Sequence, residues 1–160
     1  MHHSSRGGQK GNAFLETGLI ILPFLALIMA VVDFGLAIFL QSTCQHAVRE
    51  GVRYAVTYQT ASGLGHDASI KAVVQRNAMG FLSGDSGAGR IHIRYYDPVT
   101  FGEKTGVGSN APGSVIEVSV EDFRWDWIMP LMRSRTPLNI IARSADRMES
   151  LPTGSSPPSR

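Results

Sequence analysis

The sequence predicts an α+β protein in which a long N-terminal transmembrane helix continues into a small head, built from an antiparallel sheet of about three strands and one further helix. Three observations predict this fold. A nearly uncharged apolar run occupies residues 17–40, helical spacing of apolar residues continues beyond it, and three later segments alternate apolar and polar residues. The first two indicate one long helix, and the third indicates a sheet covered on one side.

The apolar run is long enough to span a membrane. Residues 17–40 contain one charged residue, Asp33. As a helix the run would measure roughly 36 Å, which covers a hydrocarbon core of about 30 Å. A cleaved secretory signal would need a shorter run and a small-x-small site, which the alanines of the run do not provide. We therefore predict a retained helix in contact with membrane lipid.

The charges that flank the run predict its orientation. Arg6 and Lys10 precede it, and no acidic residue accompanies them before Glu16. Positive charge tends to stay in the cytoplasm, so we expect a cytoplasmic N-terminus and an extracytoplasmic head. Arg49 and Arg53, beyond the run, weaken this asymmetry.

The N-terminal segment combines a basic leader with a glycine and an acid at a defined spacing. Gly11 ends the leader, and Glu16 follows five positions later at the start of the apolar run. This arrangement resembles the cleavage region of type IV pilin precursors. The resemblance implies that a prepilin peptidase cuts between Gly11 and Asn12, which makes Glu16 the fifth residue of the mature chain. Cleavage after either earlier glycine would place a residue without a carboxylate at that position.

A carboxylate at Glu16 has a physical use in this arrangement. An acid at the edge of hydrocarbon is costly unless it is paired. Cleavage would create an α-amino group on Asn12 that is protonated near neutral pH. Pairing of this amine with Glu16 of a neighbouring subunit would fix the axial register of two helices. Alternatively, Glu16 lies at the membrane surface and interacts with the positive end of the helix dipole.

Helical spacing continues to Tyr58, and we expect Gly63 and Gly65 to end the helix. Within it, the segments Val32-Asp33-Phe34-Gly35 and Ala47 to Ala55 resemble the start of TadE-like proteins, which are pseudopilins of the tight-adherence (Flp-type) pilus system. The resemblance covers residues 11–58 and implies a pilin-like fold.

Glu16 and five residues of these two segments are candidates for subunit assembly. The five are Asp33, Arg49, Glu50, Gly51 and Arg53. Other roles remain open for each. Asp33 contacts a neighbouring helix or reaches water, and Glu50 with Arg53 forms a solvated pair on the helix face. Gly51 permits close helix packing or is merely tolerated.

The resemblance also implies a function. We expect a minor pilin or pseudopilin of the bacterial inner membrane, without enzymatic activity, whose partners are the prepilin peptidase, other pilin subunits and the Tad platform proteins. The expected parts are a leader over 1–11, the helix over 12–60, an extracytoplasmic head over 61–149 and a disordered tail over 150–160. The alternative is an unprocessed single-span membrane protein with a binding head.

Composition argues against other classes of protein. The chain has 15 Lys and Arg against 13 Asp and Glu, with no basic cluster, so we do not expect a nucleic acid partner. Cys44 is the single cysteine, which excludes an internal disulfide and predicts a buried thiol. The histidines do not fall at metal-ligand spacings, so we expect no metal and no cofactor.

The head sequence predicts one helix from Asp67 to near Gly84, followed by strands near residues 90–95, 116–121 and 138–143. Residues 102–113 read as a glycine-rich loop between the first two strands. The segment Gly84-Asp85-Ser86-Gly87 matches the surroundings of a serine-protease nucleophile, but a glycine- and serine-rich loop is the simpler interpretation. The apolar segment 125–132 folds over the sheet as core, or contacts the membrane surface or another subunit.

Overall fold

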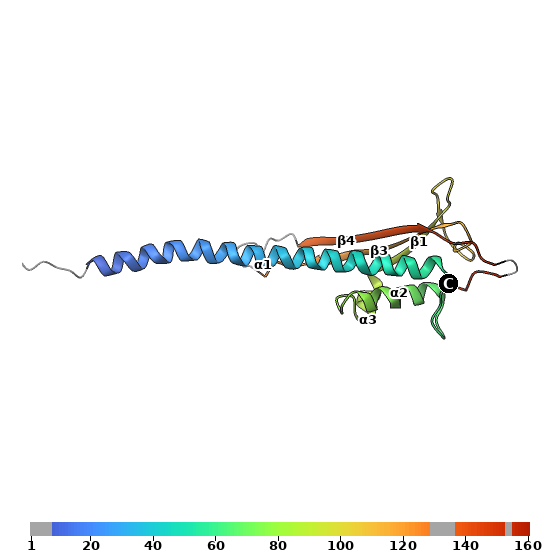
Figure 1. Cartoon of the computed structure of the whole chain (residues 1–160), viewed down its shortest axis with the longest axis horizontal. Coiled ribbons are helices and arrows are strands. Elements are labelled where there is room, and N and C mark those ends of the chain that lie inside the picture. Colours follow the sequence, from blue (N-terminus) through green and yellow to red (C-terminus); the bar gives the residue numbers. More distant parts are fainter. Residues whose placement is uncertain (1–7, 129–136, 153–154) are drawn as a thin grey trace, which may run out of the picture.

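The computed structural model describes residues 8–128, 137–152 and 155–160, with the backbone alone for residues 8–12. A long helix forms a rod, and a small head surrounds the C-terminal part of this rod (Figure 1). The elements follow the chain in the order α1 (Gly8–Val56), α2 (His66–Asn77), α3 (Gly84–Gly89), β1 (Ile91–Tyr96), β2 (Glu103–Lys104), β3 (Val115–Trp125) and β4 (Leu138–Arg147). The predicted α+β, pilin-like fold is confirmed.

The rod is a single helix of 49 residues that continues through Pro23. It ends earlier than the predicted glycine stop, because Tyr58 adopts a left-handed φ of 55° and its N–H donates to the carbonyl of Ala55 at 2.9 Å. This bond satisfies a carbonyl at the C-terminus of the helix that would otherwise lack a partner. The C-terminal end of the rod therefore lies at Val56, slightly before the predicted end at residue 60.

The sheet contains four antiparallel strands in the order β2-β1-β3-β4. The three predicted strands are present, and β1 and β3 pair with Ile93 opposite Val118. The fourth strand, β2, pairs Glu103 and Lys104 with the end of β1, inside the segment predicted to be a loop. Two residues are too few to produce an alternating pattern, so the sequence does not reveal this strand.

A bulge in β3 keeps its apolar residues on one face. Val120 lies opposite Ala142 and Phe123 lies opposite Ile140, so β3 has one more residue than β4 between these pairs. Asp122 takes up the extra length with a φ of 57°. Because the bulge reverses the alternation, odd-numbered residues face the core after it, where even-numbered residues did before.

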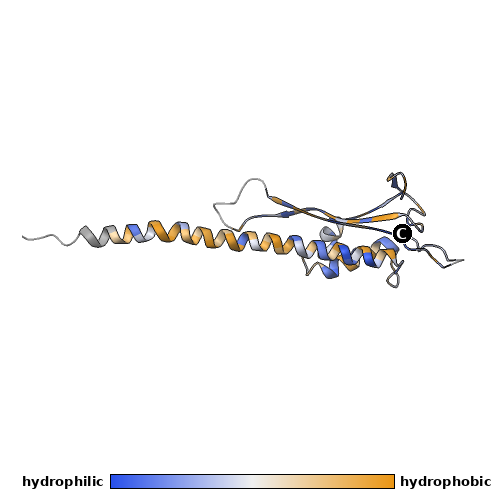
Figure 2. Cartoon of the chain, turned by 45° about the horizontal axis from the view of Figure 1, so that its top comes forward, coloured by the Kyte–Doolittle hydropathy of each residue, from blue (hydrophilic) through white to orange (hydrophobic). Residues whose placement is uncertain are grey.

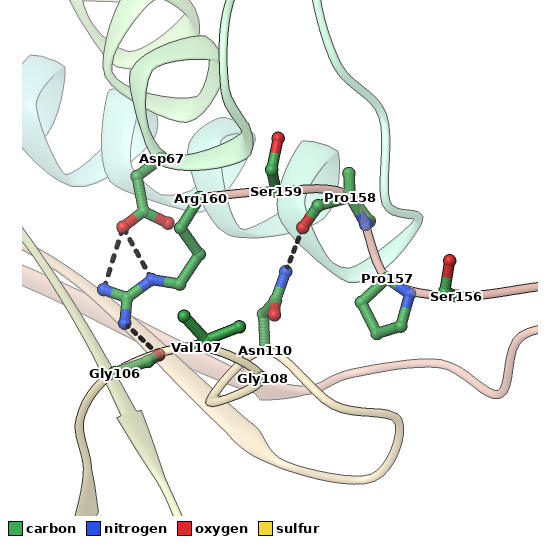
Figure 3. Close-up of a pocket in the computed structure, with 10 residues that line it drawn as sticks. All are labelled: Asp67, Gly106, Val107, Gly108, Asn110, Ser156, Pro157, Pro158, Ser159 and Arg160. Atoms are coloured by element: carbon green, nitrogen blue, oxygen red, sulfur yellow. Dashed lines mark hydrogen bonds and ion pairs between the residues drawn. The ribbon is translucent and has the colours of Figure 1, made fainter.

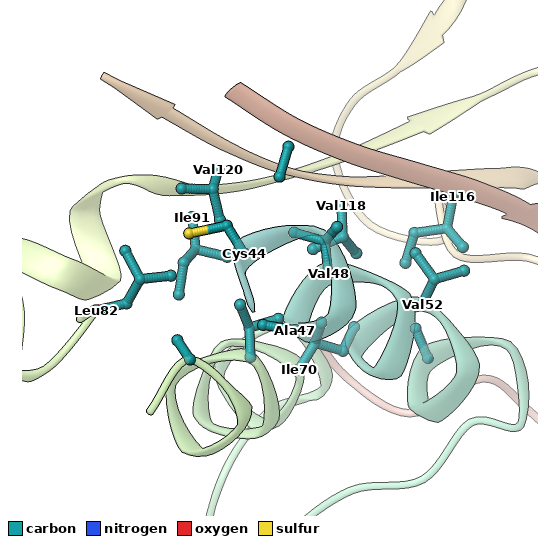
Figure 4. Close-up of a cluster of buried hydrophobic side chains, with 14 of the residues drawn as sticks. Cys44, Ala47, Val48, Val52, Ile70, Leu82, Ile91, Ile116, Val118 and Val120 are labelled. Atoms are coloured by element: carbon teal, nitrogen blue, oxygen red, sulfur yellow. The ribbon is translucent and has the colours of Figure 1, made fainter. Parts of the chain in front are cut away.

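The core lies where the rod passes between the sheet and the helix α2 (Figures 1 and 4). Apolar side chains from three directions meet here and are fully or almost fully buried: Cys44, Val48 and Val52 of α1, Ile70 and Val74 of α2, and Ile91, Ile116 and Val118 of the sheet. Cys44 is a buried free thiol, as predicted. The second half of α1 is thus the central helix of the head.

Gly51 sets the distance between α1 and α2. A Cβ atom on Gly51 would lie 2.5 Å from Cγ2 of Val74 and 3.7 Å from Cγ2 of Ile70. Such a contact is shorter than real Cβ atoms make, so only glycine lets the two helices approach this closely. Of the two predicted roles for Gly51, close helix packing is the one observed, and it is made within one chain.

The segment after α2 differs from the prediction of one helix up to Gly84. The helix α2 ends at Asn77, and Met79 and Gly80 adopt left-handed conformations. Phe81, which the apolar spacing assigned to the buried face of this helix, is 39% exposed, and its neighbour Leu82 is buried in the core instead, outside the helix. The short helix α3 then forms from Gly84 to Gly89, where a loop was predicted, with Asp85 and Ser86 exposed to solvent.

The segment 125–132 divides between two environments as far as the structure describes it. Trp125 is partly buried against the core, and Ile128 is 55% exposed. Trp127 lies in an apolar cleft beside the rod. The remaining residues, from 129 onward, lie outside the described residues.

Residues 155–160 lie against the head, whereas composition predicts a disordered tail over 150–160. The backbone N–H of His66 donates to the carbonyl of Ser159 at 2.8 Å, and Arg160 forms an ion pair with Asp67 at 2.9 Å. Composition does not reveal these contacts, because it carries no information about acceptors elsewhere in the fold.

Candidate membrane and assembly site

The N-terminal half of α1 leaves its apolar side chains exposed. From residue 13 to residue 32 no described side chain is buried, and Phe14, Leu19 and Val31 are each at least 66% exposed. Figure 2 shows the ribbon of this half of the rod coloured mostly as hydrophobic residues, whereas the half inside the head mixes hydrophobic and hydrophilic residues. Among the residues described, α1 is the one helix long and apolar enough to cross a membrane. Apolar surfaces of this extent mark membrane or protein contacts.

The head first covers the rod at Asp33. This side chain is 1% exposed, and Ala37 and Leu40 on the same side are 4% and 2% exposed. The bare part of the described helix is therefore residues 13–32, about 30 Å at about 1.5 Å per residue. The predicted span of 17–40 overlaps the head over its last eight residues. Sequence alone does not reveal the overlap, since apolar residues inside the head resemble those in lipid.

An apolar cleft marks the place where the rod enters the head. Ala30, Val31, Phe34 and Gly35 of α1 line it, together with Trp127 from the segment after β3. Tryptophan is enriched where an apolar surface meets water at the edge of a membrane. The cleft is thus a candidate boundary between the bare rod and the head.

The predicted cleavage and pairing residues lie at the free end of α1. The bond between Gly11 and Asn12 lies in the first turns of the helical backbone. Glu16 is exposed, and the hydroxyl of its neighbour Thr17 donates to the carbonyl of Ala13 at 2.8 Å. An exposed Glu16 is available to a second molecule, and its pairing remains a prediction.

The predicted assembly residues of the segment from Ala47 to Ala55 do not form one site. Arg49 and Arg53 are exposed and Glu50 is half-buried, while Gly51 faces α2 inside the head. Within the part of the chain that the structure describes, no ion pair joins Glu50 to Arg53. The two arginines are therefore available on the surface of the rod.

Two glutamines that the sequence analysis did not single out attach α1 to the edge of the sheet. The Nε2 of Gln41 donates to the carbonyl of Ile141, and the Nε2 of Gln45 donates to the carbonyl of Arg143, both at 2.8 Å. Four residues of helix rise about 6 Å and two residues of strand about 6.6 Å, so the spacings match. The contact protects β4, an edge strand, from pairing with another chain. The feature of the sequence that could have indicated this contact is the pair of glutamines, four residues apart, at the end of the apolar run.

The solvent-facing side of the sheet carries a charge cluster. Arg94 contacts Glu121 at 2.7 Å and Glu117 at 3.4 Å, and Arg143 contacts Glu121 at 3.4 Å. The hydrogen bonds from Arg94 are the main cause that lowers the pKa of Glu121 to about 2. Because these residues come from β1, β3 and β4, the cluster ties the strands together on the polar face.

The comparisons with known proteins agree with the resemblance seen in the sequence. No curated protein and no solved structure matches the chain. Residues 11–53 match a protein family described as TadE-like protein, and this range covers most of α1. The likeness to TadE-like proteins therefore covers most of the rod.

Proposed function

We propose that this chain is a minor pilin or pseudopilin of a Tad (Flp-type) pilus or secretion assembly, anchored in the bacterial inner membrane through α1. One observation carries the proposal. The TadE-like match coincides with a helix whose residues 13–32 expose apolar side chains and whose residues 40–56 contribute to the core of the head. Such a helix is suited to lie in lipid before assembly and against other rods after it.

The membrane span in this proposal is residues 13–32 rather than 17–40. Its length of about 30 Å equals the hydrocarbon thickness of a typical bilayer. Asp33 and the cleft with Trp127 then lie at the outer membrane surface, and the head is extracytoplasmic. The basic residues before the span support this orientation.

Processing by a prepilin peptidase after Gly11 fits the position of that bond in the helix. The first four N–H groups of a helix have no partner within it, so its first turns open at low free energy. The peptidase would therefore gain access to the bond between Gly11 and Asn12 without disturbing the remainder of α1.

Assembly then uses charged groups near the new N-terminus and on the part of the rod beside the head. The new amine of Asn12 pairs with Glu16 of a neighbouring subunit and sets the register of the two rods. Arg49 and Arg53, exposed on the rod beside the head, are available for contacts with other pilin subunits or with Tad platform proteins. The side chain of Asp33 is almost completely buried at the rim of the head. A partner could therefore reach it only at that rim.

The test is the N-terminus of the protein purified from native membranes. Intact-mass and N-terminal peptide analysis should find Asn12 as the first residue in a cell that contains the peptidase, and an intact leader when the peptidase gene is deleted. An intact leader in both cells would instead favour an unprocessed single-span protein with a binding head. A Gly11→Ala variant, which should accumulate uncleaved, is the matched control within the chain.

A further inference from the structure

The end of the head farthest from the free end of the rod holds an arginine side chain through several partners. The Nε of Arg160 donates to Oδ2 of Asp67 at 3.0 Å, and a terminal nitrogen lies 2.9 Å from the same oxygen (Figure 3). The other terminal nitrogen donates to the carbonyl of Gly106 at 3.2 Å and to the hydroxyl of Ser109 at 2.6 Å. All three guanidinium nitrogens therefore have acceptors.

An aromatic ring completes the arginine site. The guanidinium carbon of Arg160 lies 4.7 Å from the centroid of the Tyr95 ring, within the range of a cation–π contact. Planar stacking together with a fork of donors is the mode of binding for which arginine is better suited than lysine. The acceptors come from α2 and from the segment between β2 and β3, and the ring comes from β1.

Buried groups hold the acceptor carboxylate in place. The hydroxyl of Tyr95 donates to Oδ1 of Asp67 at 2.8 Å, and Tyr95 is fully buried. Because this hydroxyl donates to Asp67, its oxygen accepts from Nδ1 of His66 at 3.3 Å. His66 is also fully buried and stacks on Tyr58. Asp67 thus keeps Oδ2 available for a guanidinium.

The site also recognises the backbone that leads to the arginine. The N–H of His66 donates to the carbonyl of Ser159, and Nδ2 of Asn110 donates to the carbonyl of Pro158 at 2.9 Å. A Cβ on Gly65 would lie 2.8 Å from the backbone carbon of Arg160, so the peptide passes where a side chain would stand. Pro157 and Pro158 favour an extended peptide that loses little entropy on docking.

We propose that the tip of the head is a binding site for a proline-led peptide that carries an arginine side chain, and that the chain's own residues 157–160 occupy and close it. A tethered occupant has an effective concentration in the millimolar range, so a free peptide of the same sequence competes poorly. The proposal is independent of membrane anchoring and of pilus assembly.

The experiment uses the full chain in detergent and a fluorescent peptide, Ser-Pro-Pro-Ser-Arg, with an amidated C-terminus. Fluorescence anisotropy is measured for the wild type, for a variant that lacks residues 155–160 and for Arg160→Ala. Both variants should bind the peptide about tenfold or more tightly than the wild type does, because the tethered competitor is removed or weakened. Thermal unfolding of each protein verifies that its head is folded.

Matched controls test the chemistry of the site. In the truncated chain, Asp67→Asn should weaken binding about tenfold or more, because it removes the charge that pairs with the guanidinium. Asp85→Asn, at the same position in the first turn of α3 as Asp67 in α2, should leave binding unchanged. A peptide with lysine in place of arginine should bind about tenfold or more weakly.

Two results would overturn the proposal. One is the absence of peptide binding to both the truncated chain and Arg160→Ala while the head remains folded. The other is equal binding to the wild type and to these variants, which would mean that the tail does not occupy the site. If truncation unfolds the head, Arg160→Ala alone decides, because it retains the backbone of the tail.

Discussion

Gly51 of α1 and Val74 of α2 are in such close contact that an added Cβ atom would approach Cγ2 of Val74 to 2.5 Å. The approach brings the rod against α2 inside the core. It also explains a glycine inside α1, five residues before the helix ends at Val56, where glycine otherwise costs about 1 kcal/mol relative to alanine.

Gly51→Ala should therefore destabilise the head by about 1 kcal/mol, since overpacking of about 1–3 kcal/mol exceeds the gain in helix propensity. Denaturant unfolding in detergent measures the change. Gly35→Ala, with no heavy atom within 4 Å of the added Cβ, should be neutral or stabilising. Combining Gly51→Ala with Val74→Ala should remove the overlap, so Gly51→Ala should cost less free energy of unfolding in the Val74→Ala background than in the wild type. An equal cost in both backgrounds would contradict this explanation.

Gln41→Ala and Gln45→Ala should each lower stability by about 1 kcal/mol, because each leaves a carbonyl of β4 without its donor. Hydrogen exchange should report faster opening between α1 and β4 than within β1 and β3. Ser42→Ala, at an exposed position between the two glutamines, serves as the control and should change neither quantity. Equal exchange rates in the glutamine variants and this control would show that the contact is dispensable.

Acid should weaken the head through Glu121. Its pKa is lowered to about 2 from an ordinary 4.5, chiefly by hydrogen bonds from Arg94. A depressed carboxylate pKa contributes stability that is complete above about pH 4.5 and is lost as the pH falls toward 2. Glu121→Gln should flatten the loss of stability in this window, measured by chemical unfolding at several pH values. Glu103→Gln, at an exposed position on the edge strand, should retain the wild-type slope.

His66 should add a second pH dependence at milder acidity. Burial is the main cause that lowers its pKa below 6.5. The folded state therefore binds this proton less readily than the unfolded state, so stability is complete above about pH 6.5 and declines as the pH falls below it. Tyr58, Asp67, Tyr95 and Arg160 face the ring, and Asp67 opposes part of the shift. His66→Gln should abolish the slope that begins below pH 6.5, and a persistent slope there in that variant would assign it to another group.

The parts of the fold that sequence could predict are those that depend on local periodicity. The apolar run, the helix beyond it and the strands around Ile93, Val118 and Ile140 each repeat a pattern with the period of its element. The bulge at Asp122 and the two-residue strand β2 leave no such repeat. Neither could be derived without the paired strand beside it.

The candidate site divides in the same way. Gly11, Glu16 and the apolar run lie close together in sequence, so a motif could indicate them. The attachment of Gln41 to Ile141 and of Arg160 to Asp67 joins residues about 100 positions apart, and only the folded chain brings them together. The inner limit of the head at Asp33 is also invisible in sequence, because a helix inside an apolar core and a helix in lipid have the same composition.

Glu16→Gln tests the assembly proposal most directly. The substitution keeps the size of the side chain and removes the charge that would pair with the amine of Asn12 in a neighbouring subunit. Membrane insertion should be unchanged, because the apolar residues 13–32 remain, whereas pili counted by electron microscopy should be reduced strongly or lost. Thr17→Ala removes only a hydrogen bond within the helix, to Ala13, and should assemble normally. Normal piliation in Glu16→Gln, with the protein processed and in the membrane, would mean that the helices find their register without this charge pair.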